Sequence, residues 1–176
     1  FGDGLEQVGT VLGNPVGWAE NLGDRIMGVR LGSGDHGVEY NFGEYRYGSI
    51  QGAVYHDLND NGLFETHESG IEGVELQLYD SQGNLLERAS TDAQGRYQFG
   101  ELLAGTYRVV EIQPERFVDG KDALGTVGGM PMGAVESDGD GMAGITLAAG
   151  KAGIDYNFGE IQYGTIRGRV IADVNG

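Results

Sequence analysis

Apolar and polar residues alternate along much of this chain with the two-residue period of a β-strand, and no stretch shows a helical period. In one such stretch Tyr107, Val109 and Glu111 share a face. The alternation predicts strands over residues 48–56, 73–80, 85–90, 96–99, 106–112 and 145–147, and again at positions 154, 156 and 158.

Turn residues separate these segments, as in Ser81–Asn84 and Thr91–Gly95. Residues 117–142 differ, because they are rich in Gly, Asp and Met and have weak periodicity. We expect a long excursion with short strands there. Short strands at this spacing predict an all-β fold, an antiparallel sandwich of about seven strands.

The first 60 residues recur as residues 117–176 at a constant offset of 116, and about 28 of the 60 aligned positions are identical. Tyr40–Glu44, for example, recurs as Tyr156–Glu160. A fixed period of this kind indicates a tandem array of one structural unit.

We interpret residues 45–160 as one complete repeat. Residues 1–44 are then the C-terminal part of a preceding repeat, and residues 161–176 are the N-terminal part of a following one. No spacer rich in Pro, Ser or Gly separates the copies, so we expect a semi-rigid rod.

Composition and charge exclude several classes of partner. The net charge is −16 and the chain has two lysines, whereas nucleic-acid binding needs clustered basic residues. No apolar run of 18 residues is present, so we expect no membrane insertion in this segment. The chain has no cysteine, and a metal ion is the obvious alternative to disulfides as a stabilising link.

A candidate metal loop follows the first strand of the complete repeat. Residues 57–68 match the calcium-loop pattern D-x-[DN]-x-[DN]-G-x₅-E, in which Gly62 permits the sharp turn. Ca²⁺ prefers six to eight oxygen ligands, which short acidic and amide side chains at alternate positions supply. The alternative is a polar turn without metal. The predicted ligands are Asp57, Asn59, Asn61, the backbone carbonyl of Leu63, Glu65 and Glu68.

Other acidic positions are weaker metal candidates. Asp173 and Asn175 begin the same loop in the following copy. Asp92 lies in a turn, where it is either a turn-capping residue or an additional ligand. A further acidic cluster comprises Glu136, Asp138 and Asp140.

No catalytic set can be assembled. The three histidines are His36, His56 and His67, and the first two are replaced by alanine in the matching copies. No nucleophile, base and orienting residue occur together in a recognisable pattern. We therefore expect a non-catalytic protein.

Several motifs of the complete repeat resemble a known module. They are Gly48–Val54, the Asp57–Glu68 loop, Gly70–Val74, Thr91-Asp92 with Gly95, Tyr97 and Phe99, Gly105–Tyr107, and Glu111 with Pro114. Together they resemble the Sdr B-like repeat, a calcium-binding relative of the Cna B-type (prealbumin-like) domains of microbial surface proteins. The resemblance implies a Greek-key, reverse-immunoglobulin-like sandwich, an extracellular or cell-surface location, and a role as stalk or spacer.

Many Cna B-type domains form an intramolecular Lys–Asn cross-link assisted by a buried acid. Glu111 stands where the acid is expected, and Asn157 lies where an acceptor is expected. However, strand 48–56 contains no lysine, and Lys121 and Lys151 lie elsewhere. We predict no cross-link and a structural role for Glu111.

The leading hypothesis is a structural repeat of a secreted or surface-anchored fibre, rigidified by calcium. Its partners are then neighbouring repeats, with lateral or head-to-tail self-association. The alternative is an adhesin module that binds an external protein or glycan. In that case Met130, Met132 and Met142 would supply an adaptable apolar surface in the 117–142 excursion.

Overall fold

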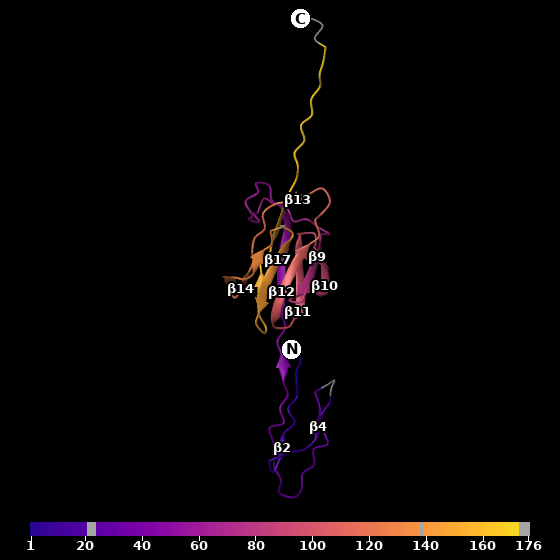
Figure 1. Ribbon diagram of the computed structural model, residues 1–176, viewed down its shortest axis with the longest axis vertical. Helices are drawn as coiled ribbons and strands as arrows, with labels where there is room; N and C mark the ends of the chain where they lie inside the picture. Colours follow the sequence, from indigo (N-terminus) through magenta and orange to yellow (C-terminus); the bar gives the residue numbers. More distant parts are fainter. Residues whose placement is uncertain (21–23, 138, 173–176) are drawn as a thin grey trace.

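A computed structural model describes residues 1–20, 24–137 and 139–172 of the chain (Figure 1). These residues form strands, turns and loops, and no helix that could cross a membrane occurs among them. Asp138, Asp173 and Asn175 lie outside the described residues, so the structure does not address these three candidate ligands.

The complete repeat folds as two packed β-sheets, as the alternation predicted. One sheet has the order β10-β9-β12-β17-β16, and the second has the order β13-β19-β8-β18-β14-β15 with β11 paired to β8. The longer strands are β8 (Gly48–His56), β9 (Glu75–Asp80), β10 (Leu85–Ser90), β11 (Arg96–Leu102), β12 (Gly105–Glu111), β17 (Gly141–Leu147), β18 (Ala152–Ile154) and β19 (Phe158–Ile161).

The pairing of the first and last strands departs from the expected antiparallel pattern. Both β18 and β19 run parallel to β8, with Ala152 opposite Ser49 and Phe158 opposite Val54. Between them, the side chain of Asn157 accepts a hydrogen bond of 2.9 Å from the N–H of Ala53. Hydrophobic alternation specifies which face of a strand is buried but not its direction, so the sequence pattern could not reveal this pairing.

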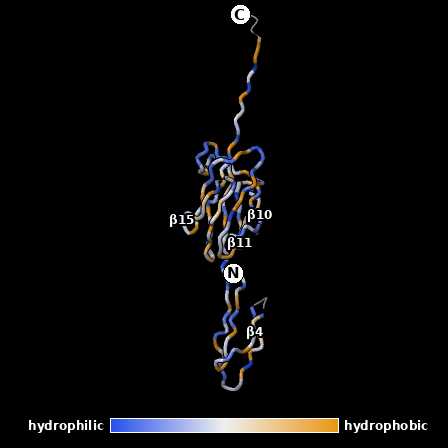
Figure 2. The backbone as a smooth tube through the Cα atoms, viewed as in Figure 1, coloured by the Kyte–Doolittle hydropathy of each residue, from blue (hydrophilic) through white to orange (hydrophobic). Residues whose placement is uncertain are grey.

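The core lies between the two sheets and contains the apolar residues that the alternation placed on inward faces. Glu111 shares the buried face of β12 with Tyr107 and Val109, as predicted. Coloured by hydropathy, the tube shows apolar segments along the strands of the sandwich and also in the N-terminal segment (Figure 2). The fully buried side chains include Ile50, Val54, Leu76, Leu78, Phe99, Val109, Met142, Ile145, Tyr156 and Phe158.

Before β17 begins at Gly141, the 117–142 excursion contains only two-residue strands. They extend the edges of both sheets: β13 and β14 pair with β19 and β18, and β16 pairs with β17. The bounds of these strands are β13 (Val118–Asp119), β14 (Thr126–Val127), β15 (Met130–Pro131) and β16 (Ala134–Val135).

The N-terminal segment repeats the same pairings at the offset of 116. Thr10 is opposite Val38 as Thr126 is opposite Ile154. The hydroxyl of Tyr40 donates to a backbone carbonyl at 2.9 Å, as does the hydroxyl of Tyr156. Its strands are β1 (Gly2–Asp3), β2 (Thr10–Val11), β3 (Asn14–Pro15), β4 (Trp18–Ala19), β5 (Ile26–Met27), β6 (Gly37–Val38) and β7 (Glu44–Tyr45).

Residues of this segment that match the core of the sandwich are exposed. Leu31 and Phe42 are 56% and 50% exposed, whereas their equivalents Leu147 and Phe158 are buried. In the complete repeat these side chains pack against strands β8 to β12, and the N-terminal segment has no equivalent of those strands among the described residues.

The join between the copies is short. Only Arg46 and Tyr47 separate β7 from β8, and the carbonyl of Arg46 accepts a hydrogen bond of 3.0 Å from Gly150. Figure 1 shows the N-terminal segment at one end of the sandwich and the C-terminal segment leaving from the opposite end. The chain therefore enters and leaves the complete repeat along its long axis.

Candidate metal centre

The 57–68 loop begins where β8 ends, with a buried carboxylate. Asp57 is 1% exposed. Its Oδ1 accepts hydrogen bonds of 3.2 Å from the N–H groups of Asn59 and Asn61, and its Oδ2 accepts one of 2.7 Å from Gly62. Burial alone would raise the pKa of Asp57, but the backbone donors of the loop, led by Gly62, hold that pKa below its ordinary value. The first predicted ligand is thus a charged carboxylate.

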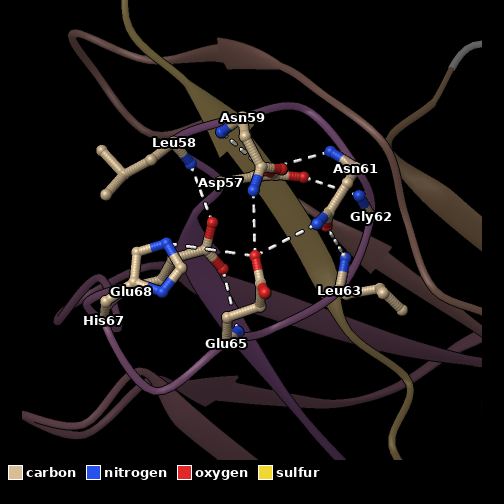
Figure 3. A network of polar contacts seen from close by, with 9 residues as sticks. All are labelled: Asp57, Leu58, Asn59, Asn61, Gly62, Leu63, Glu65, His67 and Glu68. Carbon is tan, nitrogen blue, oxygen red and sulfur yellow. Dashed lines mark hydrogen bonds and ion pairs between the residues drawn. The ribbon is translucent and has the colours of Figure 1, made fainter.

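Side chains from the middle of the loop point toward the carboxylate of Glu65 (Figure 3). Its Oε2 accepts hydrogen bonds from the side-chain amides of Asn59 at 2.9 Å and Asn61 at 3.1 Å. The buried Glu68 closes the loop, since its two oxygens accept the N–H groups of Leu58 and Glu65, each at 2.9 Å.

The residue types of the loop are those that calcium prefers, and the structure brings two of the predicted carboxylates together, without Asp57. Carboxylate oxygens of Glu65 and Glu68 lie within 4.8 Å of each other and of a nitrogen of His67. Calcium prefers oxygen to imidazole, so His67 would be a neighbour of a calcium ion in the loop and not one of its ligands. Asn59 and Asn61 present their amide nitrogens to Glu65. Rotation of the Asn59 amide by about 180° would present its oxygen instead, whereas the oxygen of Asn61 accepts the N–H of Leu63 at 2.7 Å.

Two contacts outside the predicted ligand set anchor the loop. The ring of Phe64 stacks on that of Tyr55, with 4.6 Å between their centroids, and covers the outer face of β8. The ammonium of Lys121 donates a hydrogen bond of 2.6 Å to the carbonyl of Asp60. Neither contact follows from a spacing rule, because the partners are separated in sequence and meet only in the folded sandwich.

The remaining candidates have other contacts. The N–H of Leu63 donates to Asn61 Oδ1 at 2.7 Å, and the Leu63 side chain is exposed. Asp92 accepts hydrogen bonds from Gln94 at 2.9 Å and Arg96 at 2.8 Å, as a turn-capping residue does. Glu136 forms an ion pair with Arg108 at 2.7 Å, and Asp138 of the same predicted cluster lies outside the described residues.

Sequence reasoning missed a set of buried carboxylates close to the loop. Burial, reinforced by neighbouring carboxylates, raises the pKa of Glu111 and of Glu160. Burial is also the main reason that the pKa of Asp122 rises to about 8. One signal of this buried acidic environment was present in the sequence, because the alternation placed Glu111 on the inward face of its strand.

Comparison with known proteins places the complete repeat in a family. The SdrD B-like domain family matches residues 48–160. The serine-aspartate repeat-containing protein C of Staphylococcus aureus strain Newman is 33% identical over 141 residues, which make up 80% of this chain. The chain spans 13% of the length of that relative.

Two solved structures are similar at lower identity. The minor pilin GBS52 of Streptococcus agalactiae gives a TM-score of 0.44 at 12% identity, over 72% of this chain and 49% of the pilin chain. The Bacillus anthracis TIE protein gives a TM-score of 0.46 at 15% identity, over 88% of this chain and 25% of that chain.

Proposed function

Because the chain belongs to the SdrD B-like domain family, we propose that it is a structural repeat of an extracellular, surface-anchored stalk, stiffened by calcium in the 57–68 loop. The observation that carries the calcium part is the convergence of Asn59 and Asn61 on Glu65, beside the buried Asp57 and Glu68. Hydrogen bonds thereby hold four positions of the loop pattern together, Asn59, Asn61, Glu65 and Glu68.

The loop residues would act together on one ion. Asp57, Glu65 and Glu68 are the charged ligands, and the amide oxygens of Asn59 and Asn61 are the neutral ones. A bound Ca²⁺ would offset the repulsion between these carboxylates. Extracellular modules of this kind bind calcium with a Kd of about 10⁻⁴ to 10⁻³ M, and calcium at ten times Kd would stabilise the fold by about 1.4 kcal/mol.

The stalk part of the proposal is supported by the repeat and by the join. The same strand pairings recur at the offset of 116, and two residues separate β7 from β8. Neighbouring repeats are then the partners, arranged head to tail. The net charge of −16 would keep copies apart along an extended array.

We assign no catalytic role. His56 contacts Phe117 edge-on, with 5.5 Å between the ring centroids, and His67 lies 3.9 Å from Glu65. Within the described part of the chain, neither histidine side chain is hydrogen-bonded to a Ser, Thr or Lys that could act as a nucleophile.

The adhesin alternative was based on one apolar surface formed by Met130, Met132 and Met142. Met142 is fully buried in the core, whereas Met130 is 69% exposed. The three methionines therefore do not form one apolar surface, and we retain the stalk as the proposed function.

A thermal melt across a calcium titration tests the calcium part, with wild type, Asp57→Ala and Asp80→Ala compared in calcium and in chelator. Asp80 is the matched control because its Oδ1 also accepts loop N–H groups, from Gln82 and Asn84 at 2.9 Å. Calcium should raise the Tm of wild type and of Asp80→Ala but not that of Asp57→Ala. An equal rise in all three proteins would contradict a loop site.

A further inference from the structure

A hollow of about 630 Å³ lies on the outer face of β8 and β11, the face that is turned away from the core. The register places Gln51 opposite Gln98 and Ala53 opposite Arg96, so these four side chains share that face. Ala53 is small and 5% exposed, whereas its three longer neighbours are exposed. The hollow has the size of a small-molecule binding site, which is typically about 300–1,000 Å³.

Phe64 of the 57–68 loop lines this hollow with an aromatic ring that a buried partner holds in place. The ring stacks on that of Tyr55, with 4.6 Å between the centroids and 26° between the planes, and Tyr55 is fully buried. Phe64 is 38% exposed, so the part of its ring that does not contact Tyr55 is open to a ligand. Because the ring is already positioned, binding would cost little side-chain entropy.

A second hollow, of about 460 Å³, adjoins the first, since Phe64 and Arg96 line both. Two adjoining hollows suit a ligand that consists of more than one ring. We call the two hollows together the outer groove, and the side chains that define it are Gln51, Phe64, Gln94, Arg96, Gln98 and Asp155.

Polar side chains of the outer groove are available to a ligand. Within the part of the chain that the structure describes, the side chains of Gln51, Gln98 and Arg96 form no hydrogen bond or ion pair with the protein. Arg96 donates only its backbone N–H, to Asp92 at 2.8 Å. A free guanidinium beside free amides offers donors and acceptors to one ligand.

We propose that the outer groove binds a neutral oligosaccharide, with Phe64 stacking on a sugar ring while Gln51 and Gln98 hydrogen-bond its hydroxyl groups. A sugar hydroxyl both donates and accepts, as a side-chain amide does, and the guanidinium of Arg96 adds further donors. One face of a pyranose ring consists of C–H groups, which pack favourably on the negative face of an aromatic ring. The inference goes beyond the stalk function, because it gives the repeat a lateral binding site.

Charge and backbone pairing disfavour other classes of ligand. The net charge is −16, and Asp92 and Asp155 line the first hollow, so an anionic polymer would be repelled. A peptide that adds a strand needs unpaired backbone groups, but β8 is paired with β11 on one side and with β18 and β19 on the other. A neutral ligand rich in hydroxyl groups meets neither obstacle.

An oligosaccharide array followed by NMR titration tests the proposal on the whole chain. The array would hold neutral gluco-, manno- and galacto-oligosaccharides, with sulfated oligosaccharides and peptides as the other classes. Calcium would be present throughout at a constant millimolar concentration, so that the 57–68 loop stays in one state. The neutral oligosaccharide that binds best should shift the backbone amide resonances around Gln51 and Gln98. Binding to no neutral oligosaccharide, or a preference for sulfated ligands or peptides, would overturn the proposal.

Variants then test the named contacts by calorimetric titration with that oligosaccharide. Phe64→Leu keeps an apolar cover on Tyr55 but removes the aromatic face, so the affinity should fall about tenfold. Gln98→Ala removes one hydrogen-bonding side chain and should lower the affinity about fivefold.

Matched controls lie outside the outer groove. Tyr163→Leu changes an aromatic residue that is 81% exposed, and Gln82→Ala changes an exposed glutamine in the turn between β9 and β10. Both should bind as wild type does. Gln98→Ala and the resonance shifts of wild type keep the test decisive if Phe64→Leu lowers the Tm. Wild-type affinity in both Phe64→Leu and Gln98→Ala would overturn the proposal and leave the stalk function unaffected.

Discussion

The backbone N–H of Asp57 donates a hydrogen bond of 2.8 Å to the carbonyl of Glu160. This bond joins the first residue of the 57–68 loop to the last buried acid of the repeat. Glu160 lies in β19, and the chain leaves the sandwich after Ile161. The loop and the departing strand are therefore connected at the end of the domain from which the chain leaves (Figure 1).

Replacement of Glu65 by glutamine tests the centre of the loop. Glutamine keeps an oxygen that can accept from Asn59 and Asn61 but removes the charge. The Tm in chelator should change little, and calcium affinity should fall at least tenfold, or about 1.4 kcal/mol. Calorimetric titration measures the affinity. Glu87→Gln on the exposed face of β10 is the charge-matched control, and equal affinities in the two variants would contradict a role for Glu65 as a ligand.

Gly52→Ala tests the close approach between β8 and the segment that joins β18 to β19. A Cβ on Gly52 would lie 1.8 Å from the carbonyl oxygen of Tyr156, which also accepts the Tyr97 hydroxyl at 2.8 Å. We expect this substitution to lower the free energy of unfolding by about 3 kcal/mol. Gly100→Ala in β11 is the control, since a Cβ there meets no atom within 4 Å. Chemical denaturation would measure both, and equal stabilities would show that the predicted clash is relieved without cost.

The absence of a Lys–Asn cross-link remains a prediction with a direct test. Asn157 Oδ1 accepts the N–H of Ala53, and the ammonium of Lys121 contacts Asp60 instead. The intact mass should equal the sequence mass. A mass lower by about 17 Da, the mass of ammonia, would show that a cross-link had formed.

Much of the fold follows from the sequence, although β11 and β17 extend beyond their predicted limits and tertiary contacts override the alternation in β8. Strands β8, β9, β10 and β12 lie within two residues of their predicted limits. In β8 the alternation predicted one buried face, yet Tyr55 on the other face is also buried, because Phe64 from the loop stacks on it. The periodicity of a strand cannot predict burial that is caused by a residue outside the strand.

The 57–68 loop and the buried carboxylates near it differ in how far the sequence reveals them. The 57–68 loop is local, so its spacing carries the ligand pattern. The burial of Glu111, Asp122 and Glu160 close to one another depends on the pairing of β13 with β19 and on the position of Asp140 beside the end of β12. Acids distributed in this way have no characteristic spacing, and only the folded sandwich brings them together.

Solution scattering from a chain of two complete copies of residues 45–160 tests the central claim most directly. The measurement compares millimolar calcium with chelator, for wild type and for Asp57→Ala in both copies. Calcium should convert wild type to an extended rod with a narrow distribution of maximum dimensions, and chelator should broaden that distribution. The variant should give the broad distribution in both conditions. Identical scattering of wild type with and without calcium would contradict a calcium-stiffened stalk.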